Sequence, residues 1–145
     1  MSYWDTSALG KLYLPEPDSA DFLRKAANEP LIVTAKLTLI EMRRVAFRKE
    51  SEGFIQAGAA EAVLNQMNQD IAAGEIRIVE MDASAELDLN TIMVICYRRT
   101  PPLPLRTLDA IHLTAARVAG ETEMVATDRR LREAAKLLGF SLFPA

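Results

Sequence analysis

Two acidic residues follow short apolar segments whose composition is typical of buried strands. Asp5 comes directly after segment 2–4, and Asp128 follows segment 124–126 with Thr127 between them. Sites in open parallel sheets form beyond the carboxyl ends of the strands. We therefore expect the two carboxylates to lie at the same edge of a sheet, where they could bind a metal ion.

Two further acids lie in apolar surroundings on expected helices. Glu41 follows two aliphatic residues and precedes Met42, and Asp109 lies between Leu108 and Ala110. Acids in such settings are expected to be paired or to bind a metal. If the four acids converge, two charges about 4 Å apart repel by roughly 4 kcal/mol at an effective dielectric constant near 20, and a divalent cation relieves that repulsion. Donor sets made only of oxygen favour Mg²⁺ or Mn²⁺.

Each acid also has a purely structural interpretation. Asp5 and Asp128 could cap the helices that follow them. Thr38 and Glu41 match the capping-box pattern S/T-x-x-E. Asp109 could be a first-turn acid stabilised by the helix dipole. Taken singly, each structural interpretation is the favoured one, because caps are common. Only the set of four favours a metal site.

Composition narrows the chemistry further. The chain has 145 residues, of which 50% are hydrophobic and 26% charged, as expected for one globular domain spanning residues 1–145. Its single cysteine and single histidine exclude an intramolecular disulfide, a cysteine-rich zinc site and any mechanism that needs two imidazoles. An oxygen-ligated metal suits phosphodiester hydrolysis, because it activates water and stabilises the attacking and leaving oxygens.

The net charge of −3 gives no bulk attraction to nucleic acid. Setting the four candidate acids aside leaves 16 acids against 17 bases, so the excess negative charge can be assigned to one place. The amino terminus has no basic or apolar targeting segment, and no apolar stretch is long enough to span a membrane. We expect a cytoplasmic protein that does not insert into a membrane.

Short apolar runs alternate with helical patterns along the whole chain, which predicts a three-layer α/β/α fold around a central parallel sheet. The expected strands are 2–4, 31–34, 76–79, 124–126 and 140–143. The expected helices are 7–14, 18–27, 36–50, 54–73, 83–98, 107–119 and 129–138. The proline-rich segment 101–104 cannot be a regular helix or a central strand.

The motifs and their order resemble those of a PIN domain. The resemblance rests on Glu41 and on three runs of sequence: Tyr-Trp-Asp-Thr-Ser-Ala-Leu at 3–9, Leu-Asp-Ala-Ile-His-Leu-Thr-Ala-Ala at 108–116, and Val-Ala-Thr-Asp-Arg-Arg-Leu at 125–131. It covers essentially the whole chain. The group that it resembles most is the VapC-like ribonuclease toxins of bacterial type II toxin–antitoxin pairs.

The resemblance implies an endoribonuclease that depends on Mg²⁺ or Mn²⁺. It also implies a homodimer, a cognate antitoxin protein that covers the site, and an RNA substrate, which could be a tRNA, an rRNA or an mRNA. The implied catalytic and metal-binding residues are Asp5, Glu41, Asp109 and Asp128, and the implied hydroxyl supports are Thr6, Ser7 and Thr127.

Several other residues near these motifs have two interpretations. Five arginines close to the acids in sequence could bind RNA phosphates or form a solvated face: Arg43, Arg44, Arg106, Arg129 and Arg130. Arg129 and Arg130 are the favoured substrate-binding residues, because they directly follow Asp128. For His112, polar packing between helices is favoured over substrate contact, and for Trp4, core packing is favoured over base stacking.

Three other functions remain as alternatives. A PIN-like module that binds RNA or protein without catalysis would need the acids not to converge. A phosphatase of the haloacid-dehalogenase type requires a second aspartate two residues after the first, where this chain has Ser7. A signalling receiver domain requires an acidic pair after the first strand and a lysine after the last, whereas this chain has Asp5 alone and Arg129.

Overall fold

A five-stranded, fully parallel sheet forms the centre of the computed structural model, which describes residues 1–145. Its strands are β1 (Tyr3–Trp4), β2 (Ile32–Ala35), β3 (Ile76–Val79), β4 (Glu123–Val125) and β5 (Ser141–Phe143). They are arranged in the order β3-β2-β1-β4-β5. The expected parallel sheet is confirmed, and each strand lies within one or two residues of its predicted position.

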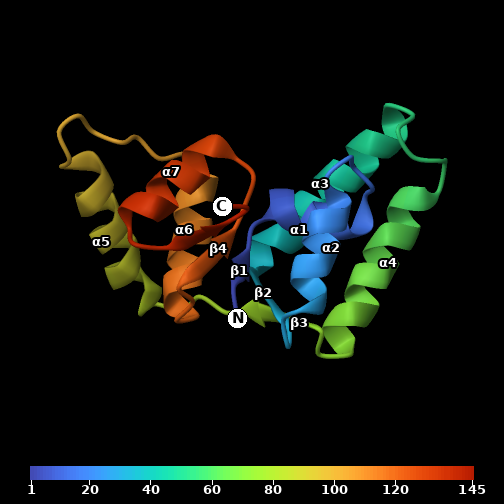
Figure 1. Ribbon diagram of the computed structural model, residues 1–145, viewed down its shortest axis with the longest axis horizontal. Coiled ribbons are helices and arrows are strands. Elements are labelled where there is room, and N and C mark those ends of the chain that lie inside the picture. The colour runs from blue at the N-terminus through green and yellow to red at the C-terminus, as the bar shows by residue number, and fades with distance from the viewer.

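Seven helices cover the two faces of this sheet (Figure 1). One layer holds α1 (Thr6–Tyr13), α2 (Ser19–Ala27), α3 (Lys36–Ser51) and α4 (Ala59–Ala72). The other holds α5 (Ala85–Tyr97), α6 (Thr107–Val118) and α7 (Arg129–Leu137). The α/β/α prediction is therefore confirmed. None of the helices is both long and apolar enough to cross a membrane.

The two residues of β1 supply one side chain to each face of the sheet, because successive strand residues point in opposite directions. Trp4 belongs to the hydrophobic core beneath α1–α4, and Tyr3 belongs to the core beneath α5–α7. Trp4 is fully buried, and its indole Nε1 donates to Glu29 Oε2 at 2.9 Å. The predicted core role of Trp4 is thereby confirmed.

The helix predicted to begin at residue 54 begins five residues later, at Ala59, so that part of the prediction is wrong. Gly58, which precedes it, has a φ of 86°, and Gly53, which follows α3, has a φ of 79°. Residues other than glycine rarely adopt this left-handed backbone conformation. The glycines therefore place a turn between α3 and α4. The predicted helix 54–73 was extended too far toward the amino terminus, into this turn.

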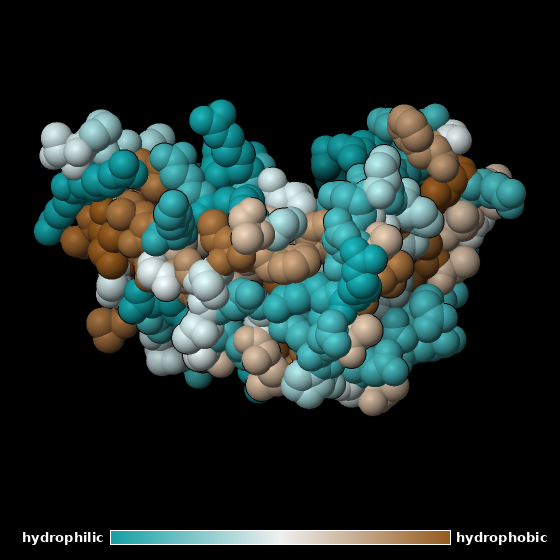
Figure 2. Space-filling model, viewed as in Figure 1, coloured by the Kyte–Doolittle hydropathy of each residue, from teal (hydrophilic) through white to brown (hydrophobic).

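The order of the strands reverses at β1, which pairs with β2 on one side and with β4 on the other. The connections leaving these strands then run to opposite faces of the sheet, which leaves a crevice beyond their carboxyl ends. Figure 2 shows the surface hollowed between the two helical layers, with hydrophilic side chains on both sides of the hollow.

Candidate active site

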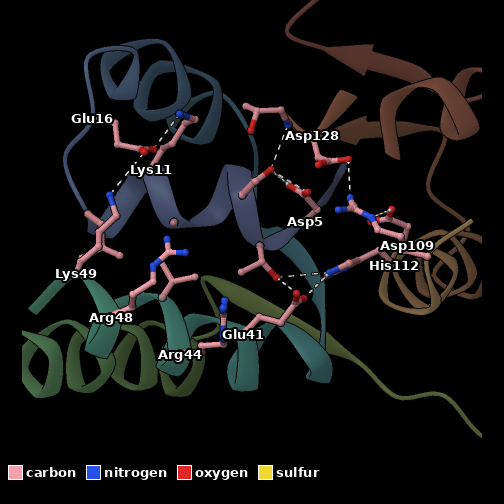
Figure 3. Close-up of a pocket in the computed structure, with 17 residues that line it drawn as sticks. Asp5, Lys11, Glu16, Glu41, Arg44, Arg48, Lys49, Asp109, His112 and Asp128 are labelled. Carbon is pink, nitrogen blue, oxygen red and sulfur yellow. Dashed lines mark hydrogen bonds and ion pairs between the residues drawn. The ribbon is translucent and has the colours of Figure 1, made fainter. Parts of the chain in front are cut away.

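All four candidate acids line one cavity of about 510 Å³ at the carboxyl edge of the sheet. Asp5 follows β1 and Asp128 follows β4, as the strand-end rule predicts. Glu41 projects from the second turn of α3, and Asp109 from the first turn of α6. The convergence on which the metal-site hypothesis depends is therefore present. Figure 3 shows the four side chains directed toward the same space.

Asp5 is the most deeply placed of these acids, with 4% of its surface exposed. Its carboxylate accepts hydrogen bonds from Ser7 Oγ at 2.7 and 2.8 Å and from the backbone N–H of Ala8 at 2.9 Å. Burial nevertheless raises the pKa of Asp5 to about 6, because a buried carboxylate loses its hydration. Asp5 is thus both the N-cap of α1 and a cavity carboxylate, so its two interpretations are compatible.

Asp128 has the same double position at the end of β4. It caps α7 by accepting the backbone N–H of Leu131 at 3.0 Å. Burial opposes its ionisation, but the backbone N–H of Leu131 and the guanidinium of Arg106 outweigh this effect. The pKa of Asp128 therefore lies below its ordinary value.

Glu41 does not close a capping box, so that alternative is wrong. The N-cap of α3 is Ala35, and Thr38 Oγ1 lies 2.7 Å from Thr34 Oγ1 instead of capping a helix end. Oε1 of Glu41 accepts from Thr6 Oγ1 and from His112 Nε2, each at 2.7 Å. Burial opposes ionisation of Glu41, but these two hydrogen bonds outweigh it and lower the pKa of the carboxyl.

The three predicted supporting residues all lie at the cavity. Thr6 contacts Glu41, and Ser7 contacts both oxygens of Asp5. Thr127 contributes its backbone N–H, which donates to Ser7 Oγ at 3.2 Å. A chain of hydrogen bonds therefore runs from the end of β4 through Ser7 to Asp5.

Arg106 neutralises the other two acids. Its Nε and Nη2 donate to the two carboxylate oxygens of Asp109 at 2.8 and 3.3 Å. The same Nη2 lies 2.9 Å from Asp128 Oδ1. A planar guanidinium suits such two-point contacts with a carboxylate. Arg106 thus joins the start of α6 to the end of β4 across the mouth of the cavity.

His112 is a buried polar residue between helix and sheet, as its pattern favours. Its Nδ1 lies 2.6 Å from the Tyr3 hydroxyl, and its Nε2 reaches Glu41. Sequence reasoning missed the contact with Tyr3, since nothing in a two-residue apolar strand indicates which way a phenol hydroxyl points. The contact with Glu41 was equally hidden, because the two residues are 71 positions apart.

Five basic side chains line the same cavity: Lys11, Arg44, Arg48, Lys49 and Arg106. Arg129 and Arg130, the predicted substrate contacts, are exposed in the first turn of α7 and lie outside this lining. Lys11, Arg48 and Lys49 were not predicted. Helical spacing could have revealed Arg48, which lies one turn beyond Arg44 on α3.

The donor chemistry of the cavity fits a hard divalent cation, because the acids offer only oxygen and Asp5 is a poorly solvated carboxylate. A guanidinium already bridges two of them, so this position stabilises positive charge. As the side chains are arranged, no group of three His, Cys, Asp or Glu residues is close enough to enclose an ion. Asp5, Asp109 and Asp128 line the same cavity, with Glu41 beside them.

Comparison with known proteins identifies the fold and its family. The PIN domain family matches residues 2–137. The chain belongs to the PIN domain family. It is 32% identical to Ribonuclease VapC35 of Mycobacterium tuberculosis, over 98% of this chain and 95% of that protein. The resemblance inferred from the motifs is thereby confirmed.

Two solved structures share the fold. One is VapC20 of Mycobacterium tuberculosis, described as a sarcin–ricin loop cleaving toxin. It has a TM-score of 0.64 and 19% identity, covering 92% of this chain and 95% of that chain. The other is FitAcB from Neisseria gonorrhoeae, with a TM-score of 0.61 and 15% identity, covering 99% of this chain and 96% of that chain. At these identities the likeness concerns the fold.

Proposed function

We propose that this PIN domain protein is an endoribonuclease that depends on Mg²⁺ or Mn²⁺ and acts as the toxin of a toxin–antitoxin pair. The observation that carries the proposal is the convergence of Asp5, Glu41, Asp109 and Asp128 in one cavity. The relationship to VapC35, which is named a ribonuclease, supports the choice of RNA as substrate.

The four acids have different roles in this proposal. Asp5, Asp109 and Asp128 would hold the cation, with Glu41 beside them. A bound cation would supply Lewis acidity and would activate water for attack on the phosphodiester. Thr6 and Ser7 hold Glu41 and Asp5 in position by the hydrogen bonds described above, and Thr127 holds Ser7. Such supporting contacts orient ligands and raise the affinity of a metal site.

Two other parts of the proposal concern partners. We propose that a cognate antitoxin covers the cavity and that the protein is a homodimer, as the resemblance to VapC toxins implies. Arg129 and Arg130, exposed beside Asp128, are proposed substrate contacts. Light scattering of the purified protein tests the dimer, and co-purification with the product of an adjacent reading frame tests the antitoxin.

The central experiment is RNA cleavage by purified protein with Mg²⁺, with Mn²⁺ and with EDTA. We expect cleavage with at least one of the two cations and none with EDTA. Asp5→Asn and Asp109→Asn should each abolish it, because each removes a charged oxygen ligand. Cleavage that persists in both variants or in EDTA would refute the mechanism. Sequencing of RNA ends after brief induction in cells would then locate the target.

One observation favours a second candidate, a PIN module that binds RNA or protein without catalysis. Arg106 already neutralises Asp109 and Asp128, as expected if their role were structural. Calorimetric titration with Mn²⁺ separates the two functions. Binding that is lost in Asp5→Asn supports the nuclease, whereas no binding by the native chain supports the module.

A further inference from the structure

Two of the basic side chains at the cavity have no acidic partner. Arg106 is paired with Asp109 and Asp128. Lys11 and Lys49 both contact Glu16, at 2.9 and 3.6 Å. The side chains of Arg44 and Arg48 make no ion pair or hydrogen bond, although both line the cavity. They are drawn without partners in Figure 3.

The two unpaired arginines follow Glu41 along one face of α3. Glu41, Arg44 and Arg48 are three and four residues apart, so they lie on the same side of the helix. One helical turn separates the two arginines by about 6 Å along the axis. This distance is comparable to that between successive phosphates of a nucleic-acid strand. In Figure 3 the three side chains follow one another from α3 into the space beneath α1.

Like charges four residues apart on a helix repel each other and weaken it. Neither arginine offsets this cost by an ion pair within the chain, and both are exposed. The whole protein carries a net charge of −3, so it does not attract a polyanion in general. An anion that contacts both guanidinium groups would relieve the repulsion at this one place.

We propose that Arg44 and Arg48 form a backbone-binding row, in which the two guanidinium groups bind successive phosphates of a single RNA strand leading away from the acids. The inference rests on the proposed function and adds the path of the substrate to it. Arginine suits this role because its planar guanidinium binds phosphate oxygens at two points.

The depth of the acids favours a single strand over a duplex. Asp5 is 4% exposed and Asp109 is 7% exposed, at the base of a cavity of about 510 Å³. A duplex is too wide to place a phosphodiester there, whereas an unpaired loop or end can bend into the cavity. The row on α3 then lies beside the strand as it leaves the site.

The experiment measures RNA affinity at a series of KCl concentrations by fluorescence anisotropy. The probe is labelled single-stranded RNA of mixed sequence, and every protein carries Asp5→Asn so that the probe is not cut. Arg44→Gln, Arg48→Gln and the double variant are compared with Arg43→Gln. Arg43 is the matched control, since it is exposed on the same helix but lies outside the cavity, where its Nη1 donates to Leu39 O.

Each lost phosphate contact reduces the slope of log affinity against log salt by about 0.7 for a single strand. We therefore expect Arg44→Gln and Arg48→Gln each to reduce the slope by about 0.7, and the double variant by about twice that. Arg43→Gln should leave the slope unchanged. None of the substitutions should lower the thermal midpoint, because no ion pair is lost.

Three results would overturn the proposal of a backbone-binding row. The first is an unchanged slope in both cavity variants, and the second is an equal loss in Arg43→Gln. The third is polyglutamate binding that depends on Arg44 and Arg48 and is stronger than RNA binding, which would assign the row to an acidic protein. The affinity for a blunt RNA duplex could also be measured. If it depended on the two arginines as strongly as the affinity for the single strand does, the choice of a single strand would be overturned.

The row and the proposed function fail in distinguishable ways. If the native chain cuts RNA but the slopes are unaffected, only the row is wrong. If no cation supports cleavage and the slopes still fall, the row holds and the nuclease proposal fails.

Discussion

The Nε2 atom of His112 lies 2.7 Å from Oε1 of Glu41 and so links α6 to α3 across the sheet. The other ring nitrogen lies 2.6 Å from the hydroxyl of Tyr3. Burial raises the pKa of Tyr3 well above its ordinary value, so the hydroxyl keeps its proton in this contact. Nε2 of His112 donates to Glu41, because a carboxylate oxygen only accepts. Tyr3 on β1 thereby acts through His112 to orient Glu41 on α3.

This arrangement predicts that His112 positions Glu41 through Nε2 alone. Gln is long enough to place its amide N–H near the position of Nε2, whereas Asn is too short. His112→Asn should weaken Mn²⁺ binding by about 10- to 100-fold, the usual effect of losing a contact to a metal ligand. His112→Gln should stay close to the native affinity. Calorimetric titration measures both values, and far-ultraviolet circular dichroism checks that each variant is folded. Equal affinity in the two variants would limit His112 to a packing role.

A second prediction concerns competition between Arg106 and a divalent cation for the oxygens of Asp109 and Asp128. Because the cation must displace the guanidinium from these oxygens, Arg106→Gln should bind Mn²⁺ several-fold more tightly. In EDTA the same variant should unfold at a lower temperature, since Asp109 is left with a buried, unpaired charge.

Arg117→Gln is the control for that experiment. Arg117 also lies on α6 and pairs with a carboxylate, Asp88, at 3.3 Å, but the pair is remote from the cavity. Its loss should leave Mn²⁺ affinity unchanged. Weaker Mn²⁺ binding in Arg106→Gln would contradict competition and would show that the guanidinium holds the acids in place for the metal.

The sequence was sufficient to predict the parallel sheet and the four acids. Asp5 and Asp128 follow from strand-end logic, because the chain direction decides at which edge of the sheet a residue lies. Glu41 and Asp109 follow from the mismatch between a charged side chain and its apolar neighbours. These signals are local in sequence, so they could be recognised before the fold was known.

The contacts between elements could not be predicted in this way. Arg106 was weighed as a phosphate ligand, yet its guanidinium reaches Asp128, 22 positions away, because the start of α6 and the segment after β4 lie at the same edge of the sheet. Arg129 and Arg130 were favoured because they adjoin Asp128, but adjacency in sequence does not decide on which side of a helix a residue projects. That Lys49 also lines the cavity was recognisable only once α3 was placed beside α1.

A third prediction follows from the buried carboxylate of Asp5, whose pKa is raised from 3.8 to about 6 by burial. Between these two values the folded protein keeps a proton that the unfolded chain releases. The free energy of unfolding therefore falls as the pH rises through this window and stays lower above it. A shift of this size corresponds to about 3 kcal/mol.

Asp5→Asn should remove this penalty without removing the helix cap, since Asn accepts the backbone N–H of Ala8 as well as Asp does. In EDTA, the variant and the native protein should have similar stability near pH 4, and the variant should become the more stable by up to about 3 kcal/mol above pH 6. Chemical unfolding at a series of pH values measures the difference. A difference that does not change with pH, or a native protein more stable than the variant at pH 8, would show that the folded protein does not raise the pKa of Asp5.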